Sequence, residues 1–261
     1  MSSDVKWPFP RRPGLLWNTA STVTLAAVGG FSKLLMRVLN DAQVYNMAVL
    51  TEAVERRHPS QPLITVSNHA SCMDDPLMWG ILKWRYLCSR KQVRWTLAAE
   101  DICFTNRLHA IFFCLGQTIP VRRGGGVYQR GVDFMVEQLN RGRWVHMFPE
   151  GKVNMTQEMI RLKWGVGRLI EECQQTPVVI PIWHVGMDTV LPNVKPYIPR
   201  SGKRVTVLVG QPFQLHSILT QLRKDQKSPV EKRKVLTDHI QDQFVRLKAE
   251  TEALHYQTVD S

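Results

Sequence analysis

The sequence has little that would cross-link the chain or carry it repeatedly through a membrane. It contains five cysteines, an odd number, and no two of them are spaced as Cys-x-x-Cys. We therefore expect reduced, mostly buried thiols, with neither a disulfide framework nor a metal site. A mean hydropathy of −0.20 excludes a polytopic membrane protein. A composition of 44% apolar and 21% charged residues excludes a disordered, collagenous or coiled-coil chain.

Acidic residues are also scarce. Lys and Arg number 34 against 22 Asp and Glu, which gives a net charge of +12. A chain this basic is expected to bind an anionic partner, which can be nucleic acid, an anionic membrane or a phosphorylated substrate. We predict no nucleic-acid binding, because the chain has no basic motif with interleaved aromatic residues. Residues 76–99 hold basic residues and no acid, so they form either a lipid-binding patch or a solvated face.

One long uncharged run lies near the N-terminus, at residues 13–32. It is long enough to cross a bilayer, but Asn18 and several Ser and Thr residues make its hydrophobicity modest. Trp7 and Trp17 are placed like anchors at a membrane interface. A spanning helix, an interfacial helix, an organellar targeting segment and a helix packed on the domain all fit this pattern. We expect membrane attachment without a full span, and we divide the chain into a membrane-attachment segment, residues 1–40, and a main domain, residues 41–261.

Beyond residue 40, short runs rich in β-branched and aromatic residues alternate with segments of helical periodicity. This alternation predicts a layered α/β domain. The expected strands are residues 63–67, 93–97, 117–121, 144–148, 178–183 and 205–209. The expected helices are residues 76–86, 101–115, 126–140, 156–174, 213–224 and 229–254, and residues 186–204 are expected to form a long irregular loop. Pro181 predicts an edge strand or a bulge, because proline cannot donate to a strand ladder.

A histidine and an aspartate follow the first of these strands, in the string NHASCMDDP at residues 68–76. Pro76 suits the first turn of a helix and Asp75 suits its N-cap, so His69 lies at the C-terminal end of a strand. Ligand sites in open α/β sheets gather at such ends. If the turn folds His69 against Asp74, the carboxylate fixes one ring nitrogen and leaves the other as a base. The alternative is a surface histidine beside a helix cap.

Two further strings follow other expected strands. The string FPEG, residues 148–151, places the Glu150 carboxylate and the flexible Gly151 backbone where a polar head group can bind; a Pro-Gly turn with a solvated glutamate is the alternative. The string GQTIPVRR, residues 116–123, ends in Arg122 and Arg123, and arginine suits bidentate contact with phosphate. A solvated basic loop explains that string equally well.

Together these strings resemble the glycerolipid acyltransferase superfamily, whose domain is called PlsC-like. Asn-His-x4-Asp, Gly-x5-Arg, Phe-Pro-Glu-Gly and a Val/Ile-Pro strand occur in this order over about residues 60–185. The longer strings WVHMFPEGKVNM, RLKWGVGRLI and PIWHVGMDTVLPN are similar to one branch, the mitochondrial phospholipid–lysophospholipid transacylases. The resemblance implies a central mixed sheet flanked by helices, with an N-terminal membrane-associated helix before the acyltransferase domain.

The resemblance also implies roles for individual residues. It assigns general base and acid catalysis to the pair His69 and Asp74, with no metal. The implied substrate-binding residues are Asn68, Arg122, Arg123, Phe148, Pro149, Glu150, Gly151, Asn154 and Lys163. The superfamily often has Phe-Ile before its arginine, whereas this chain has Ile-Pro-Val, so the sequence leaves open whether Arg122 or Arg123 binds phosphate.

The implied reaction moves an acyl chain from a phospholipid to a lysophospholipid without coenzyme A or another cofactor. The characteristic lipids are cardiolipin and monolysocardiolipin, and the implied location is an anionic mitochondrial membrane, inner or outer, on the side of the intermembrane space. The nearest alternative is a coenzyme A-dependent acyltransferase of the lysophosphatidate type, which needs the same base. A second alternative is an acyl-enzyme on Ser71 or Cys72, which direct attack by a lipid hydroxyl makes unnecessary.

Overall fold

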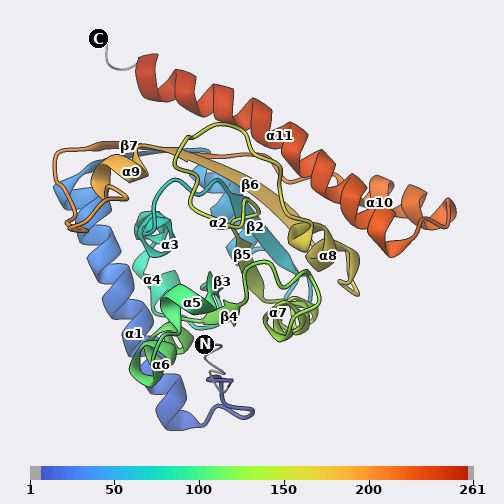
Figure 1. The fold of residues 1–261 in the computed structure, drawn as a ribbon, viewed down its shortest axis with the longest axis horizontal. Helices are drawn as coiled ribbons and strands as arrows, with labels where there is room; N and C mark the ends of the chain where they lie inside the picture. The colour runs from blue at the N-terminus through green and yellow to red at the C-terminus, as the bar shows by residue number, and fades with distance from the viewer. Residues whose placement is uncertain (1–6, 258–261) are drawn as a thin grey trace.

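The computed structural model describes residues 7–257, so residues 1–6 and 258–261, the outer ends of the two expected segments, lie outside it. Seven strands form one sheet in the order β1-β7-β6-β2-β5-β3-β4, with helices on both faces (Figure 1). The predicted layered α/β fold is confirmed. The strands are β1 (Asp41–Tyr45), β2 (Leu63–Ser67), β3 (Trp95–Ala99), β4 (Thr118–Val121), β5 (Trp144–Met147), β6 (Val178–Val185) and β7 (Arg204–Val209).

The pairing of the strands brings the sequence motifs to one edge of the sheet. Strand β2 pairs in parallel with β5 and β6, β5 pairs in parallel with β3, and β3 with β4. Strand β7 is parallel to β1 and antiparallel to β6, so the sheet is mixed, as expected. Since parallel strands end at the same edge, the loops after β2, β4, β5 and β6 lie along it. These loops begin with NHASCMDDP, the two arginines, FPEG and the string GMDTVLPN.

Apolar side chains form one core on each face of the sheet. One core is built with α7 (Arg130–Asn140), α8 (Gly165–Glu171), α10 (Leu215–Lys224) and α11 (Pro229–Gln257). The other is built with α2 (Met47–Glu55), α3 (Asp74–Leu77), a 3₁₀ turn (Met78–Ile81), α4 (Trp84–Leu87) and the π-helical turn Leu34–Leu39 that continues α1 (Leu15–Lys33). The remaining short helices are α5 (Glu100–Cys103), α6 (Arg107–Leu115) and α9 (Met187–Val190).

One side of α1 packs along the domain. Its buried residues Ser21, Leu25, Gly29 and Ser32 recur at helical spacing and form a single stripe. The approach at this stripe is close, because a Cβ on Gly29 would lie 2.9 Å from the Leu87 side chain. The other side is apolar and exposed at Leu15, Leu16, Val23 and Phe31. With its π-helical continuation the helix has 25 residues and a window of hydropathy 1.4, of which 28% is buried, so length and composition alone would allow it to cross a membrane.

Several predicted helices are shorter than expected or broken. The helix expected at 76–86 is wrong as one element, because Leu82, with an extended ψ angle of 156°, interrupts it. The helix expected at 101–115 is divided at Phe104 into α5 and α6. In the segment 156–174 only α8, from Gly165 onward, is helical. Strand β1 and helix α2 were not predicted.

Pro181 does not lie on an edge strand, so the edge-strand alternative of that prediction is wrong. Strand β6 is interior, between β2 and β7. Its pairing with β7, however, covers only Ile182–Val185. Just beyond the end of β7, the Gly210 N–H donates to the Pro181 carbonyl at 2.8 Å. Proline is therefore tolerated at a point where β6 has strand pairing on one side only.

All five cysteines are free thiols, but they are not mostly buried. Cys114 and Cys173 are buried and Cys103 is half-buried, whereas Cys72 and Cys88 are exposed. The expectation of a mostly buried set is therefore wrong, because Cys72 and Cys88 lie at turns on the surface although their apolar neighbours Ala70 and Leu87 are buried.

Candidate active site

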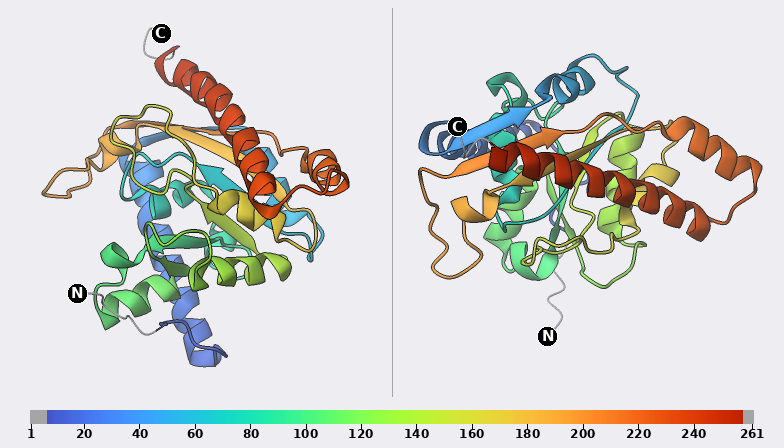
Figure 2. Two further views of the ribbon diagram at one scale, coloured as in Figure 1. Left: turned by 45° about the vertical axis from the view of Figure 1, so that its right-hand side comes forward. Right: turned by 90° about the horizontal axis from the view of Figure 1, so that it is seen from above.

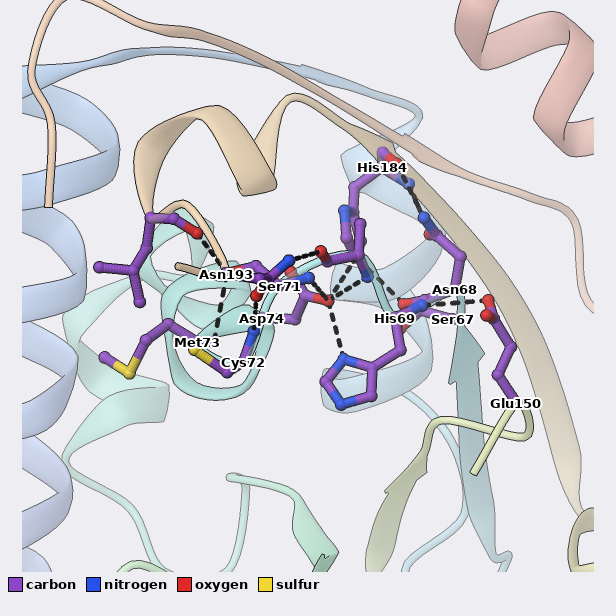
Figure 3. A network of polar contacts seen from close by, with 12 residues as sticks. Ser67, Asn68, His69, Ser71, Cys72, Met73, Asp74, Glu150, His184 and Asn193 are labelled. Carbon is purple, nitrogen blue, oxygen red and sulfur yellow. Dashed lines mark hydrogen bonds and ion pairs between the residues drawn. The ribbon is translucent and has the colours of Figure 1, made fainter. Parts of the chain in front are cut away.

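The loop after β2 folds His69 against Asp74. The Nδ1 atom of His69 lies 2.9 Å from Oδ2 of Asp74, and the same oxygen accepts the backbone N–H groups of Ala70 at 2.7 Å and Ser71 at 2.9 Å (Figure 3). The Asp74 side chain is completely buried. Two backbone donors and the imidazole therefore fix the position of the buried Asp74 carboxylate. In this position the carboxylate can accept a hydrogen bond from a proton on Nδ1 of His69.

The imidazole of His69 has one free nitrogen. The ring stacks on Phe148, with centroids 4.2 Å apart and planes inclined by 23°, and its side chain is 19% exposed. Within residues 7–257, no group is hydrogen-bonded to Nε2 of His69. A carboxylate that holds Nδ1–H leaves Nε2 unprotonated, so this nitrogen can accept a proton from a group in the adjoining solvent-accessible space.

The backbone of this loop is held by side chains from distant strands. The Asn68 amide bonds to both backbone groups of His184 on β6: its Oδ1 accepts the N–H and its Nδ2 donates to the C=O, each at 2.9 Å. The Ser71 hydroxyl donates to the Leu191 carbonyl at 3.0 Å. Because the Asn68 side chain is buried and both of its amide groups are occupied, its geometry fits a positioning role more closely than the substrate contact expected from sequence.

The string FPEG braces the same loop from β5. Oε1 of Glu150 accepts the backbone N–H of His69 at 3.1 Å, and the Asn154 N–H donates to the His69 carbonyl at 2.7 Å. Glu150 is 3% exposed, and this burial raises the pKa of its carboxyl group, against the opposing effect of the His69 N–H. Gly151 has a φ of 71°, a conformation that suits glycine. The Lys163 N–H, donating to the Pro149 carbonyl at 2.7 Å, closes the turn.

The two arginines lie on the same edge of the sheet but not beside His69. They follow β4, which is separated from β2 by β5 and β3, so three strand spacings of roughly 4.8 Å each separate the two positions. Both side chains are exposed. Arg123 forms an ion pair with Asp101 of α5, whereas no ion pair of Arg122 occurs within residues 7–257. Arg122 is thus the arginine whose side chain is available to a phosphate.

Three polar groups near the site were missed by the sequence analysis. His184 is buried, with Nε2 3.6 Å from Oδ2 of Asp74, so a second imidazole faces the carboxylate. Arg94, expected in a basic surface patch, is instead buried and pairs with Asp75 through Nε–Oδ1 at 2.8 Å and Nη2–Oδ2 at 2.7 Å. Burial alone would raise the pKa of Asp75, but the Arg94 guanidinium lowers it. Asp75 is therefore a buried ion-pair partner and does not cap the helix.

His146 is the second buried histidine of this region. His146 lies on β5. Its Nδ1 is 2.8 Å from the Thr65 hydroxyl oxygen, and its Nε2 is 3.3 Å from the Ser67 hydroxyl oxygen. Burial lowers its pKa to about 3, so it is neutral at physiological pH. The signal for this residue was present in the string WVHMF, where a histidine interrupts an apolar strand, but only the strand pairing shows what it contacts.

A small cavity lies beside the loop, lined by residues that include His69, Glu150, His184, Asp188 and Lys248. Within residues 7–257, no group of three or more His, Cys, Asp or Glu side chains is arranged to hold a metal ion. The cavity adjoins His69 and lies between the loop, the end of β6 and α11.

Comparison with known proteins gives a consistent set of relatives. A protein-family model described as Acyltransferase matches residues 44–185. Tafazzin of Drosophila melanogaster is 48% identical over 257 residues, covering 98% of this chain and 68% of that protein. N-acylphosphatidylethanolamine synthase of Arabidopsis thaliana is 41% identical over 196 residues, covering 73% of this chain and 69% of that protein. Tafazzin of Saccharomyces cerevisiae is 30% identical over 268 residues, covering 86% and 70% respectively.

A solved structure shows the same fold. The crystal structure of the 1-acyl-sn-glycerophosphate acyltransferase PlsC from Thermotoga maritima matches with a TM-score of 0.55 at 18% identity, covering 90% of this chain and 96% of that one. At this level of identity the likeness concerns the arrangement of the sheet and its helices.

Proposed function

The chain belongs to the tafazzin family of glycerolipid acyltransferases, which confirms the resemblance seen in its motifs, and on this premise we propose that it is a coenzyme A-independent phospholipid–lysophospholipid transacylase that remodels cardiolipin. The observation that carries the proposal is the partly exposed His69 imidazole held by the buried Asp74 carboxylate, with no hydrogen-bond partner for Nε2 among residues 7–257. The proposed substrates are a phospholipid donor and a lysophospholipid acceptor, with monolysocardiolipin the acceptor that yields cardiolipin.

The geometry supports a single imidazole that works first as base and then as acid. Nε2 of His69 removes the proton from the free hydroxyl of the lysophospholipid, and that oxygen attacks the carbonyl carbon of a donor ester. Asp74 stabilises the imidazolium that forms. When the tetrahedral intermediate collapses, the donor's ester C–O bond breaks and His69 returns the proton to the departing lyso-lipid oxygen. One ester is broken and one is formed, so no cofactor is consumed.

Direct attack by the lipid is favoured over an acyl-enzyme by the state of the two nearby nucleophiles. The Ser71 hydroxyl is buried and donates to a backbone carbonyl. For Cys72, burial and the nearby Asp74 carboxylate raise the pKa of the thiol, which keeps it protonated and a poor nucleophile. Neither side chain makes a hydrogen bond with His69, as an activated nucleophile would require.

Substrate binding is proposed for exposed groups along the same edge of the sheet. Arg122, which has no acidic partner among residues 7–257, is the residue that we propose binds a lipid phosphate, with Arg123 beside it. Phe148 and the Pro149–Gly151 turn form one wall beside the imidazole, and the exposed Lys163 adjoins that turn. Glu150 and Asn154 hold the His69 backbone, so we assign them to positioning.

The packing of α1 supports attachment to one leaflet without a full span. Its buried stripe from Ser21 to Ser32 follows the domain for more than half of the helix. If α1 crossed a bilayer, part of the polar domain packed against it would therefore lie inside the hydrocarbon core, which is about 30 Å thick. A helix whose exposed side is apolar can instead lie in the interface. We propose that the domain lies at a mitochondrial membrane and faces the intermembrane space, the location that the resemblance of its motifs implies.

The proposal is tested by acyl transfer between purified lipids. Wild type, His69→Ala and, as the matched control, His216→Ala are mixed with radiolabelled phosphatidylcholine and monolysocardiolipin without coenzyme A. Because a general base contributes ~10²–10⁴-fold, His69→Ala should lose nearly all transfer. His216, exposed on α10, should be dispensable.

The results separate the proposed function from its alternative. If the wild-type protein transfers an acyl chain only when acyl-coenzyme A is added, it is instead a coenzyme A-dependent acyltransferase. Equal rates for wild type and His69→Ala would exclude the proposed chemistry.

A further inference from the structure

The loop between α9 and β7, residues 191–203, projects from the domain (Figure 2). Its tip combines exposed apolar side chains with cations: Val194 is 60% exposed, Tyr197 54% and Ile198 62%, and Lys195 and Arg200 are also exposed. The sequence contains no acid from residue 189 to residue 224. Exposed aliphatic and tyrosine side chains flanked only by positive charge are complementary to the interface of an anionic bilayer.

The base of this loop holds the segment that carries the catalytic pair. Asn193 donates through Nδ2 to the Ala70 carbonyl at 2.7 Å, and its Oδ1 accepts the Cys72 N–H at 3.0 Å (Figure 3). Along the backbone, these two contacts of Asn193 alternate with the N–H groups of Ala70 and Ser71, which donate to the Asp74 carboxylate. Displacement of Asn193 would therefore move the peptides that set the position of Asp74.

The far end of the loop is tied to the end of the N-terminal helix. The Gly202 N–H donates to the Leu39 carbonyl at 2.7 Å, and the Lys203 N–H donates to Oδ1 of Asn40 at 2.8 Å. Nδ2 of Asn40 also donates to the Arg200 carbonyl at 3.0 Å. The loop is thus fixed at one end to the catalytic segment and at the other to the chain that leaves α1.

We propose that the 191–203 loop docks on an anionic lipid surface and that Asn193 is a positioning residue, which couples this docking to the geometry of the His69–Asp74 pair. The role of Asn193 in catalysis rests on the proposed acyl transfer, whereas the docking of the loop on lipid does not. Helices α5 and α6, with exposed Ile102 and Leu108, project on the same side of the molecule as the loop in both views of Figure 2, so one lipid surface can meet both.

The binding part is tested by sedimentation with vesicles of phosphatidylcholine with and without cardiolipin. The tip variant Tyr197→Glu/Ile198→Glu should bind cardiolipin vesicles about ten- to a hundredfold more weakly than wild type, because two apolar side chains are no longer buried in lipid. The matched control is Val230→Glu/Val245→Glu, which makes the same type of change at exposed valines of α11 and should bind as wild type does. Unchanged binding by the tip variant would overturn the docking surface.

The coupling is tested by the ratio of kcat on vesicles to kcat on monomeric short-chain lipids. Asn193→Ala should bind vesicles normally but lower this ratio by about tenfold, and Asn193→Asp, which keeps the acceptor for Cys72 N–H, should restore part of it. A merely structural defect would lower both rates in proportion and leave the ratio unchanged, which would overturn the coupling.

A second readout needs no catalysis. Alkylation of the exposed Cys72, followed by peptide mass spectrometry with Cys88 as the internal reference, should be several-fold faster in Asn193→Ala. An unchanged alkylation rate would contradict the role of Asn193 in holding the loop. If no acyl transfer occurs with any lipid, the proposed function fails, while sedimentation and alkylation still decide the inference.

Discussion

Replacement of Asp74 by asparagine removes the charge of the catalytic pair while it preserves the shape of the site. The carboxylate is completely buried, and its Oδ2 accepts three donors between 2.7 and 2.9 Å. An asparagine carbonyl can keep the two backbone donors of Ala70 and Ser71, so the loop should stay folded. The imidazolium formed during transfer loses its counter-charge. In a serine-protease triad the same change costs about 10⁴-fold in rate, and we expect a loss of about 10³–10⁴-fold here, equivalent to about 4–5.5 kcal/mol.

The assay is the initial rate of cofactor-free transfer from labelled phosphatidylcholine to monolysocardiolipin. Asp242→Asn, at an exposed position of α11, is the matched control and should retain the wild-type rate. Circular dichroism melting and vesicle sedimentation establish that Asp74→Asn is folded and bound to lipid. If the folded variant keeps more than about a tenth of the wild-type rate, Asp74 does not stabilise a catalytic imidazolium and the reasoning is refuted.

Two further predictions concern buried ionisable side chains. Burial lowers the pKa of His146 in the folded protein from its usual 6.5 to about 3, so the unfolded state binds more protons between these two pH values. The free energy of unfolding should therefore fall as the pH drops from 6.5 toward 3. His146→Gln should show a smaller fall in urea midpoint between neutral and mildly acidic pH, and an equal fall would contradict this origin. Arg94→Leu leaves the Asp75 carboxylate buried without its partner and should lower the free energy of unfolding by about 3–5 kcal/mol in urea titrations. If the free energy of unfolding falls by less than about 1 kcal/mol, water reaches the Asp75 carboxylate in Arg94→Leu and the carboxylate is not left buried.

The strands could be predicted from sequence more closely than the helices. Runs such as LITVS and VTVLV are buried on both sides, so a nearly continuous apolar run is enough to identify them. The segment 76–86 has apolar residues at helical spacing, but the extended Leu82 divides it into short turns that pack against α1. Strand β1 was missed because DAQVY is half-exposed and becomes a strand only by pairing with β7, far along the chain.

The candidate site was predicted where its residues are close in sequence. His69 and Asp74 are five residues apart, so a single turn brings them together, and the motif spacing contained that information. Asn193 and His184 lie more than a hundred residues beyond them and reach the loop only because β6 pairs with β2. No local pattern distinguishes an asparagine that holds a loop from one that faces solvent. The catalytic roles and the substrate contacts of all these residues stay predictions.

The close contact of Gly29 with Leu87 has a consequence for how the enzyme would sit at its membrane. Helix α1 is seated directly on the domain, with no flexible linker between them. Under the proposed attachment, the height of the imidazole above the lipid head groups is therefore a fixed dimension of the molecule. Head-group packing and membrane curvature set how many lipid ester groups lie at that height. The rate of acyl transfer would therefore depend on membrane curvature without any change in the conformation of the enzyme.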